Sequence, residues 1–113
     1  MIKKMDKQGI KEINQLDNNG NKVGYWEFYY DNGKLLNKAN YENGKRVGYW
    51  EYYYSNGKIC CKGNYENGNY VGYWMFYYNN GQLHSKGNYE NGKPVGYWEW
   101  YHENGQLMGK SLF

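Results

Sequence analysis

The sequence predicts an all-β protein, built as a single-domain antiparallel β-meander of stacked hairpins. Two observations predict this fold: a strict 24-residue repeat, and Asn-Gly dipeptides that separate short runs rich in aromatic residues. The chain contains 16 tyrosines and 5 tryptophans among its 113 residues. Their rings favour strands because they pack well on a pleated, half-buried surface. A chain of this length has the size of one domain.

The repeat is clearest in the glycines and tryptophans that recur every 24 residues. They are Gly24, Gly48, Gly72 and Gly96, and Trp26, Trp50, Trp74 and Trp98. A fixed period of this size is typical of supersecondary units that stack on one another. We therefore expect a repeat domain over residues 24–113, with repeats at 24–47, 48–71, 72–95 and 96–113. Residues 1–23 are expected to form a degenerate half-repeat that caps the N-terminal end, and the last repeat closes as a half-unit.

Two sets of Asn-Gly dipeptides divide each repeat into two strands. One set follows the aromatic run, as at Asn32-Gly33, and the other precedes the next Gly-Tyr-Trp, as at Asn43-Gly44. Asn-Gly favours a two-residue type I′ turn, because both central residues of that turn need a positive φ. About nine strands are then expected, the first of them a weak one near residues 10–16.

A two-residue turn at Asn32-Gly33 determines the pairing of the first hairpin. In this register Tyr30 faces Leu35. Further from the turn, Trp26 faces Ala39. In the next two repeats a glycine replaces the alanine, so each indole lies opposite a residue with little or no side chain. This arrangement leaves room for a large ring, and we expect the tryptophan side of the sheet to be buried.

The other side of the sheet is expected to be exposed and to carry two tyrosines of each repeat with one residue between them. In three of the four repeats that residue is a glutamate facing a lysine across the hairpin. The pairs are Glu27–Lys38, Glu51–Lys62 and Glu99–Lys110. Opposite charges placed in this way each contribute about 0.2–1 kcal/mol. In the third repeat Met75 replaces the glutamate, and Lys86 is expected to have no partner.

This exposed side is the predicted binding surface, because tyrosine rings bury much area at low entropic cost and keep a polar tip. Met75 is an apolar break in the charged column and a candidate centre of contact. The alternative is that the tyrosines are structural and stack along the sheet in place of a second layer. The candidate partner-binding residues are Tyr25, Tyr29, Tyr49, Tyr53, Tyr73, Met75, Tyr77, Tyr97 and Tyr101.

No set of residues suggests catalysis, a metal site or a cofactor. His84 and His102 occupy slots that hold other residue types in the other repeats. Cys60 and Cys61 are adjacent in a predicted strand, where neighbours point to opposite faces, so a disulfide between them would be strained. The glycines belong to turns, and no glycine-rich loop opens a helix, which argues against a phosphate cradle. We therefore expect a protein that is not an enzyme and holds no cofactor or metal.

The charge pattern does not favour a nucleic-acid partner. The formal net charge is only +3, and the lysines of the exposed side are mostly opposed by glutamates. Lys3 and Lys4 precede no apolar run, so neither a signal peptide nor a transmembrane segment is expected. The expected compartment is the cytoplasm. Whether a leader peptide has been removed is a question that the sequence leaves open.

The repeat unit resembles the MORN (membrane occupation and recognition nexus) repeat over residues 20–113. The resemblance is carried by Gly24-Tyr25-Trp26, Tyr29-Tyr30, Asn32-Gly33 and Asn43-Gly44-Lys45, and by their later copies. The unit is most similar to the variant in bacterial "toxin–antitoxin system, YwqK family antitoxin" proteins. This resemblance implies an elongated, twisted sheet that binds proteins or, in some members, lipid. The antitoxin name implies a toxin as partner, and no catalytic residues come with the family.

Three functions follow from these observations. The first is a non-enzymatic module of the antitoxin or immunity type, which covers a partner protein with its aromatic face. The second rests on a resemblance to the cell-wall-binding repeats of choline- and glucan-binding proteins, whose rings bind quaternary ammonium groups or sugars. Those repeats are typically shorter and follow a signal peptide. The third is a structural protein that self-associates, with homo-oligomers formed by pairing of edge strands.

Overall fold

The structure is a computed structural model that describes residues 2–6 and 9–113. These residues form strands joined by turns, and no helix among them is long and apolar enough to cross a membrane. The strands are β1 (Ile2–Asp6), β2 (Gly9–Ile13), β3 (Gln15–Leu16), β4 (Lys22–Tyr29), β5 (Leu35–Glu42), β6 (Lys45–Arg46), β7 (Gly48–Tyr53), β8 (Ile59–Glu66), β9 (Asn69–Tyr77), β10 (Leu83–Glu90), β11 (Lys93–Tyr101) and β12 (Leu107–Leu112).

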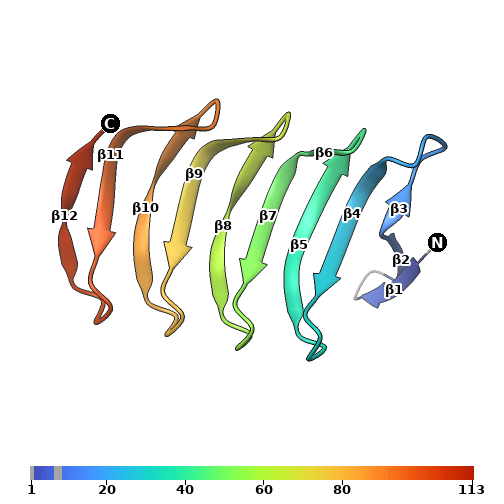
Figure 1. Ribbon diagram of the computed structural model, residues 1–113, viewed down its shortest axis with the longest axis horizontal. Helices are drawn as coiled ribbons and strands as arrows, with labels where there is room; N and C mark the ends of the chain where they lie inside the picture. The colour runs from blue at the N-terminus through green and yellow to red at the C-terminus, as the bar shows by residue number, and fades with distance from the viewer. Residues whose placement is uncertain (1, 7–8) are drawn as a thin grey trace.

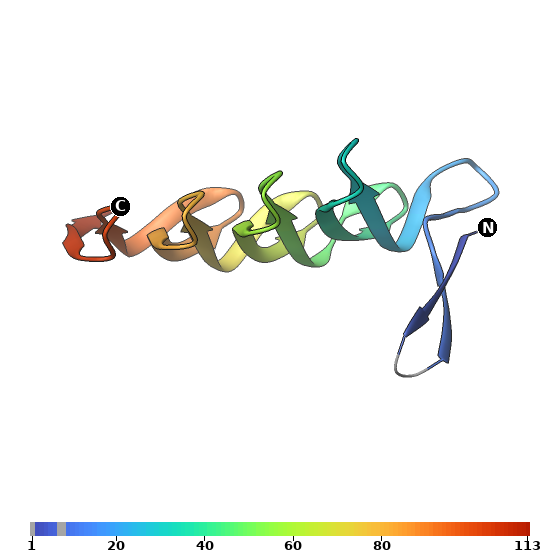
Figure 2. The same ribbon diagram turned by 90° about the horizontal axis from the view of Figure 1, so that it is seen from below.

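One open antiparallel sheet of ten strands runs through the molecule. Its order is β12-β11-β10-β9-β8-β7-β5-β4-β3, and β6 pairs with β5 beside this path. Neighbours in sequence are therefore neighbours in the sheet, which confirms the predicted all-β meander (Figure 1). The molecule measures 47 × 31 × 26 Å, and Figure 2 shows the strands following one another in a single row along its length.

The N-terminal segment differs from the single weak strand expected near residues 10–16. The strand is interrupted at Asn14, which has a φ of 58° and lies between β2 and β3. β2 pairs with β1 in a separate two-stranded sheet, whereas β3 pairs with β4 in the main sheet. Figure 2 shows the β1–β2 hairpin projecting away from the row of strands. The cap over residues 1–23 stays a prediction, and its residues 1, 7 and 8 lie outside the described residues.

The two sets of Asn-Gly turns have different geometries. In the turns that precede the second, third and fourth Gly-Tyr-Trp, both residues have a positive φ, with Asn43 at 50° and Gly44 at 77°. These are the predicted two-residue type I′ turns. They recur at Asn67-Gly68 and Asn91-Gly92. At Asn19-Gly20, before the first Gly-Tyr-Trp, only Gly20 has a positive φ, so the prediction of this turn type is wrong there.

The prediction of a two-residue turn at Asn32-Gly33 is wrong. Of these two residues only Gly33 has a positive φ, of 85°, and its amide donates to the Tyr30 carbonyl at 2.9 Å. The Tyr30 amide in turn donates to the Lys34 carbonyl at 2.8 Å. The loop is therefore the three residues 31–33, a type I turn followed by a left-handed glycine. The Asn32 side-chain oxygen supports this loop by accepting a hydrogen bond from the Lys34 amide at 2.9 Å.

The longer loop shifts the strand pairing near the turn. Tyr29 pairs with Leu35 in place of Tyr30, and the extra residue Leu36 forms a bulge. Beyond the bulge the predicted register is confirmed, since Trp26 pairs with Ala39. The prediction therefore placed the large rings correctly and failed only within a few residues of the turn.

The tryptophan side of the sheet, here called the Trp face, holds the core. Trp50, Trp74 and Trp98 are buried, and each indole N–H donates to a backbone carbonyl of the preceding strand. The ring of Tyr65 lies edge-on between two of them, with centroids 5.0 Å from Trp50 and 5.3 Å from Trp74. Aromatic rings therefore form a continuous layer across the repeats, and burial of this side is confirmed.

The glycines on the Trp face make room for the next repeat as well as for their own hairpin. Gly63 pairs with Trp50 in the register, as predicted. A Cβ at Gly63, however, would lie 2.2 Å from the ring of Trp74, which belongs to the following hairpin. A Cβ at Gly87 would likewise lie 2.3 Å from the ring of Trp98. Each of these glycines thus allows one repeat to pack closely on the next.

Hydrogen bonds also connect one repeat to the next near the three-residue loops. The Tyr30 hydroxyl donates to the Tyr53 carbonyl at 2.5 Å, and the Asn32 side-chain amide donates to the Ser55 carbonyl at 3.3 Å. The same bonds recur as Tyr54–Tyr77 and Asn56–Asn79. The second tyrosine of each Tyr-Tyr pair therefore has a structural role in the stack.

Candidate binding surface

The predicted site residues lie together on the side of the sheet opposite the Trp face, here called the Tyr–Glu face. Within a strand, the two tyrosines flank a glutamate and donate their hydroxyls to it. Tyr49 and Tyr53 donate to the two carboxylate oxygens of Glu51, at 2.7 and 2.5 Å. The face consists of Tyr25, Glu27, Tyr29, Tyr49, Glu51, Tyr53, Tyr73, Met75, Tyr77, Tyr97, Glu99 and Tyr101.

The same arrangement occurs in the first repeat and in part in the fourth. Tyr25 and Tyr29 donate to Glu27 at 2.8 and 2.6 Å, and Glu27 is buried. In the fourth repeat Tyr101 donates to Glu99 at 3.2 Å. Carboxylates accept such bonds strongly, so each glutamate holds the rings beside it in a defined orientation.

The third repeat departs from this arrangement because Met75 replaces the glutamate. Tyr77 donates to the Met75 sulfur at 3.7 Å, and a thioether is a weak acceptor. The centre of the Tyr–Glu face is therefore less polar and less charged than either end.

The tyrosine rings of this face are only partly accessible. Four are exposed by about half or more: Tyr29 by 51%, Tyr49 by 45%, Tyr73 by 47% and Tyr97 by 69%. The other site residues are half-buried, namely Tyr25, Tyr53, Met75, Tyr77 and Tyr101. The face thus presents rings that are fixed at one edge and open to solvent at the other. This geometry allows both the binding role and the structural role that the sequence left open.

The lysines of this face pair with the glutamates of the next hairpin. Lys38 lies 3.6 Å from Glu51, and Lys86 lies 3.7 Å from Glu99. The expectation that Lys86 has no partner is therefore wrong. The reason is that each central lysine has a neighbouring strand on both sides, and the sequence argument considered only one of them.

The lysine affected by Met75 is instead Lys62. It faces Met75 across β8 and β9, and its ammonium lies 5.8 Å from the centroid of the Tyr77 ring. Among the described residues, no carboxylate lies within ion-pair distance of this ammonium. The centre of the face therefore combines an apolar side chain with a positive charge held over an aromatic ring.

Burial and hydrogen bonding shift the pKa values on this face. Burial alone would raise the pKa of Glu51, but hydrogen bonds from Tyr53 and Tyr49 and the charge of Lys38 outweigh it and lower the pKa. The pKa values of Tyr49 and Tyr53 are raised by burial and then by their bonds to Glu51. The carboxylate of Glu51 and the neutral phenols of Tyr49 and Tyr53 are therefore the stable forms at neutral pH.

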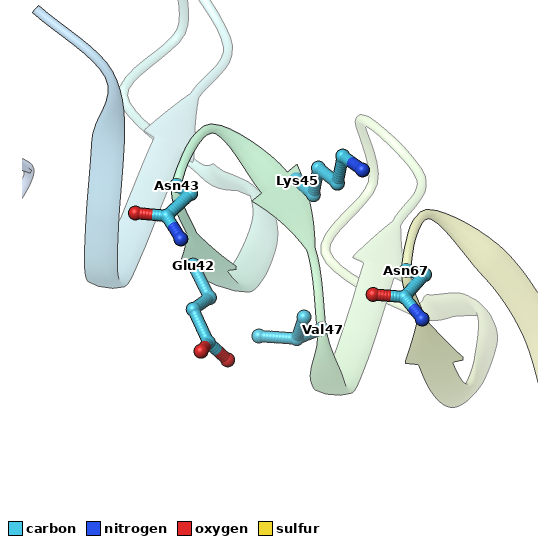
Figure 3. Close-up of a pocket in the computed structure, with 5 residues that line it drawn as sticks. All are labelled: Glu42, Asn43, Lys45, Val47 and Asn67. Atoms are coloured by element: carbon cyan, nitrogen blue, oxygen red, sulfur yellow. The ribbon is translucent and has the colours of Figure 1, made fainter.

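A hollow of about 190 Å³ lies between two successive type I′ turns. Figure 3 shows the side chains of Glu42 and Val47 directed to the same side of the ribbon, with Lys45 pointing away from them. Asn43 and Asn67 complete the lining. Because the two charged groups diverge, this hollow has no set of converging polar groups, and it is a weaker candidate than the Tyr–Glu face.

The histidines and cysteines lie outside this surface. The ring of His84 packs edge-on against Tyr78 and Trp100, with centroids 4.8 and 6.0 Å away. Cys60 and Cys61 are free thiols. Among the side chains that the structure describes, no group of three or more from His, Cys, Asp or Glu is placed to hold a metal ion.

The expectation that the two thiols point to opposite faces is wrong. Tyr52 pairs with Cys61 and Tyr53 pairs with Ile59, so Cys60 is the extra residue of a bulge. The bulge turns both thiols toward one hollow on the Trp face, which Arg46 also lines. Sequence reasoning missed this hollow, although a signal existed. Arg46 is the only arginine of the chain, in a slot that other repeats fill with Lys22, Tyr70 and Pro94.

The outer edge of β12 carries a further group of exposed apolar side chains. They are Leu107, Met108 and Leu112, followed by Phe113. Their exposure is compatible with the predicted pairing of edge strands, which stays a prediction.

Comparison with protein families identifies the repeat. A family described as "MORN repeat variant" matches residues 22–43, 46–67, 70–91 and 94–113. These segments begin two residues before the repeats that the glycine spacing defines. A comparison with curated proteins finds no match.

Proposed function

We propose that this chain, which belongs to the MORN repeat variant family, is a non-enzymatic module. It binds a protein through its Tyr–Glu face. One observation carries the proposal: tyrosines in every repeat lie on one face, and hydrogen bonds to Glu27, Glu51 and Glu99 hold most of them in place. Rings that are already ordered lose little entropy when a partner covers them. Protein partners favour such rings because each offers a large apolar area with a polar tip.

The size of the sheet suits a protein partner. A standard interface covers about 800 Å² on each partner. The molecule measures 47 Å by 31 Å along its two longest axes, so one face provides a footprint of this size. A small ligand would use only one or two repeats of such a surface, whereas a protein would use the whole ladder.

We place the centre of contact at Met75 and Lys62. A methionine adapts its shape to a partner, and among the described residues no carboxylate lies within ion-pair distance of the cation beside it, although Glu51 faces it across β7 and β8. A partner surface that offers an apolar side chain next to an aspartate or glutamate would satisfy both groups. Such a central, partly desolvated pair is where binding energy concentrates in protein interfaces.

The finer proposal is that the partner is a toxin and that this chain is its antitoxin or immunity protein. The resemblance of the repeat unit to the YwqK family antitoxin variant supports it. Occlusion of a toxin requires complementary shape and charge and no chemistry by the chain itself. Expression of the captured partner alone should slow the growth of its host, and co-expression of this chain should restore it. Equal growth in both cases would exclude a toxin as partner.

The test of binding compares the wild type with the triple variant Tyr49→Ser/Tyr73→Ser/Met75→Glu. Each protein, checked for folding by circular dichroism, is used to capture partners from native cell lysate, and the partner is then purified and titrated. The variant should bind at least about tenfold more weakly than the wild type. The double variant Glu66→Gln/Glu90→Gln, which changes exposed residues at the type I′ turns, is the matched control and should bind as the wild type does.

Other outcomes would favour the other functions. Capture of no protein, together with tryptophan quenching by a glycan or a choline-containing lipid, would favour a carbohydrate or lipid ligand. Concentration-dependent assembly of the purified chain in sedimentation would favour self-association through edge strands. Equal affinity of the folded triple variant and the wild type would move the site away from the Tyr–Glu face.

A further inference from the structure

A second hollow lies on the Trp face, opposite the proposed protein-binding surface. Its volume is about 430 Å³, within the range of about 300–1,000 Å³ that is usual for small-molecule sites. It spans the second repeat and its neighbours. The lining residues are Tyr30, Leu36, Arg46, Tyr52, Tyr53, Cys60, Cys61, Tyr65 and Tyr70.

One reason for the open space is that the second repeat has a small thiol, Cys60, where the other repeats have the larger Leu36, His84 and Met108. The slot of Cys60 is taken in the next repeat by His84. There the imidazole packs against Tyr78 at 4.8 Å and Trp100 at 6.0 Å between centroids. A thiol is much smaller than an imidazole, so Cys60 fills less of the space beside it than His84 does.

One end of the hollow carries a single cation. The Arg46 guanidinium lies 5.7 Å from the centroid of the Trp50 ring and 5.6 Å from that of Tyr65. Its side chain is exposed, and among the described residues no carboxylate lies within ion-pair distance of it. The two rings hold the guanidinium over the hollow, where its planar set of N–H donors is available for an anion.

The walls are aromatic and neutral. The hydroxyls of Tyr52 and Tyr65 are 3.0 Å apart and bond to each other. Burial, followed by the neighbouring Cys60, raises the pKa of Cys61 to about 12, so this thiol is uncharged at neutral pH. Arg46 is therefore the only charge in the lining at neutral pH.

We propose that this hollow binds a small planar aromatic acid, with its ring against Tyr52, Tyr65 and Tyr70 and its carboxylate or phosphate on Arg46. An apolar ring matches the aromatic walls, and one anionic group matches the one cation. A neutral aromatic molecule would lack the charged contact, and a molecule with two separate anionic groups would leave one of them without a partner. The proposal does not depend on the Tyr–Glu face, because the rings and the cation that it uses lie on the other side of the sheet, although Tyr53 belongs to both linings.

The test uses 1-anilinonaphthalene-8-sulfonate as a fluorescent probe, whose sulfonate stands in for the carboxylate or phosphate. N-phenyl-1-naphthylamine has the same rings without the anion and is the neutral comparison. Arg46→Gln should weaken binding of the anionic probe by about tenfold and leave the neutral compound within about twofold of the wild type. Competition of the probe by 2-naphthoate and by 2-naphthyl phosphate then shows which anion the site prefers.

Lys22→Gln is the matched control. Lys22 takes the slot of Arg46 one repeat earlier, and its ammonium lies 5.5 Å from the ring of Trp26 and 5.6 Å from that of Tyr41. The substitution removes the same charge from an equivalent position outside the hollow, so probe affinity should stay within about twofold of the wild type. An equal loss in both variants would mean that net charge, and not the hollow, attracts the probe.

A second variant locates the site independently of charge. Cys60→Phe places a ring in the hollow and should abolish binding of both probes, provided that near-ultraviolet circular dichroism and the urea midpoint show a folded protein. If this variant unfolds, protection of the wild-type thiols is measured instead. The bound probe should slow their modification by a disulfide reagent several-fold. Unchanged thiol reactivity with bound probe, or no effect of Arg46→Gln, would overturn the proposal.

Discussion

The two faces of one sheet are built on different principles, although they share every strand. On the Trp face the indoles are buried, and their N–H groups bond to backbone carbonyls. On the Tyr–Glu face the phenols are partly exposed and bond to side-chain carboxylates of the same strand. Since neighbouring residues of a strand point to opposite sides, one run such as residues 49–53 contributes to both faces.

This difference explains how a single-layer sheet can be both stable and available for binding. The Trp face provides cohesion between repeats, because Trp74 lies over Gly63 of the preceding hairpin. The Tyr–Glu face adds hydrogen bonds that orient its rings without covering them. Stability and recognition can then vary separately, and substitutions on the two faces should differ sharply in their cost.

The sharpest comparison replaces two adjacent residues of β9. Trp74 is fully buried, so Trp74→Ala should lower the free energy of unfolding by about 3–5 kcal/mol. Tyr73 points to the other face and is 47% exposed, so Tyr73→Ala should cost less than about 1 kcal/mol. Urea unfolding followed by far-ultraviolet circular dichroism measures both. Similar costs for the two variants would mean that the Tyr–Glu face is structural to the same degree as the Trp face.

The second comparison tests the close contact between repeats. The added Cβ of Gly63→Ala would meet the Trp74 ring at 2.2 Å, so the variant should be destabilised by about 1–3 kcal/mol. Gly109→Ala is the control, because a Cβ there has no atom within 4 Å, and its effect should stay within about 0.5 kcal/mol. Ala39 already occupies the equivalent slot in the first repeat. A negligible cost at Gly63 would mean that later repeats can adopt the packing of the first.

The third comparison concerns pH and the Tyr–Glu face. The folded-state pKa of Glu51 is lowered below 4.5, so its stabilising effect is complete above that pH and is lost as the pH falls through the folded value. Glu51→Gln should therefore cost about 0.5–1.5 kcal/mol at neutral pH and less at about pH 3. Urea midpoints at both pH values measure the change. The exposed Glu66→Gln is the control, and a cost for Glu51→Gln that is equal at both pH values would contradict the assignment.

The sequence predicted those features that depend on one hairpin alone. The order of the strands, the burial of the tryptophans and the pairing of Trp26 with Ala39 all follow from the period and from strand alternation. The type I′ turn at Asn43-Gly44 also follows from its own two residues. Each of these predictions required no knowledge of the neighbouring repeat.

The errors concern contacts between repeats and bulges. The same dipeptide forms a longer loop at Asn32-Gly33, where the Asn32 amide donates to Ser55 of the next repeat. Lys38 pairs with Glu51 of the next hairpin, which a register for one hairpin does not show. The binding role of the tyrosines stays a prediction, because half-exposed rings suit recognition and stacking equally well.

The smallest effect is expected from a substitution that gives the third repeat the glutamate found in the other repeats. Met75→Glu places a carboxylate beside Lys62, and the cross-strand pair should add about 0.2–1 kcal/mol at low salt. Met75→Gln, similar in shape and uncharged, is the control, and about 1 M salt should remove the difference between the two variants. Equal urea midpoints at low salt would show that Lys62 gains nothing from a carboxylate. A more stable Met75→Glu that binds the partner less well would mean that the methionine serves recognition at the expense of stability.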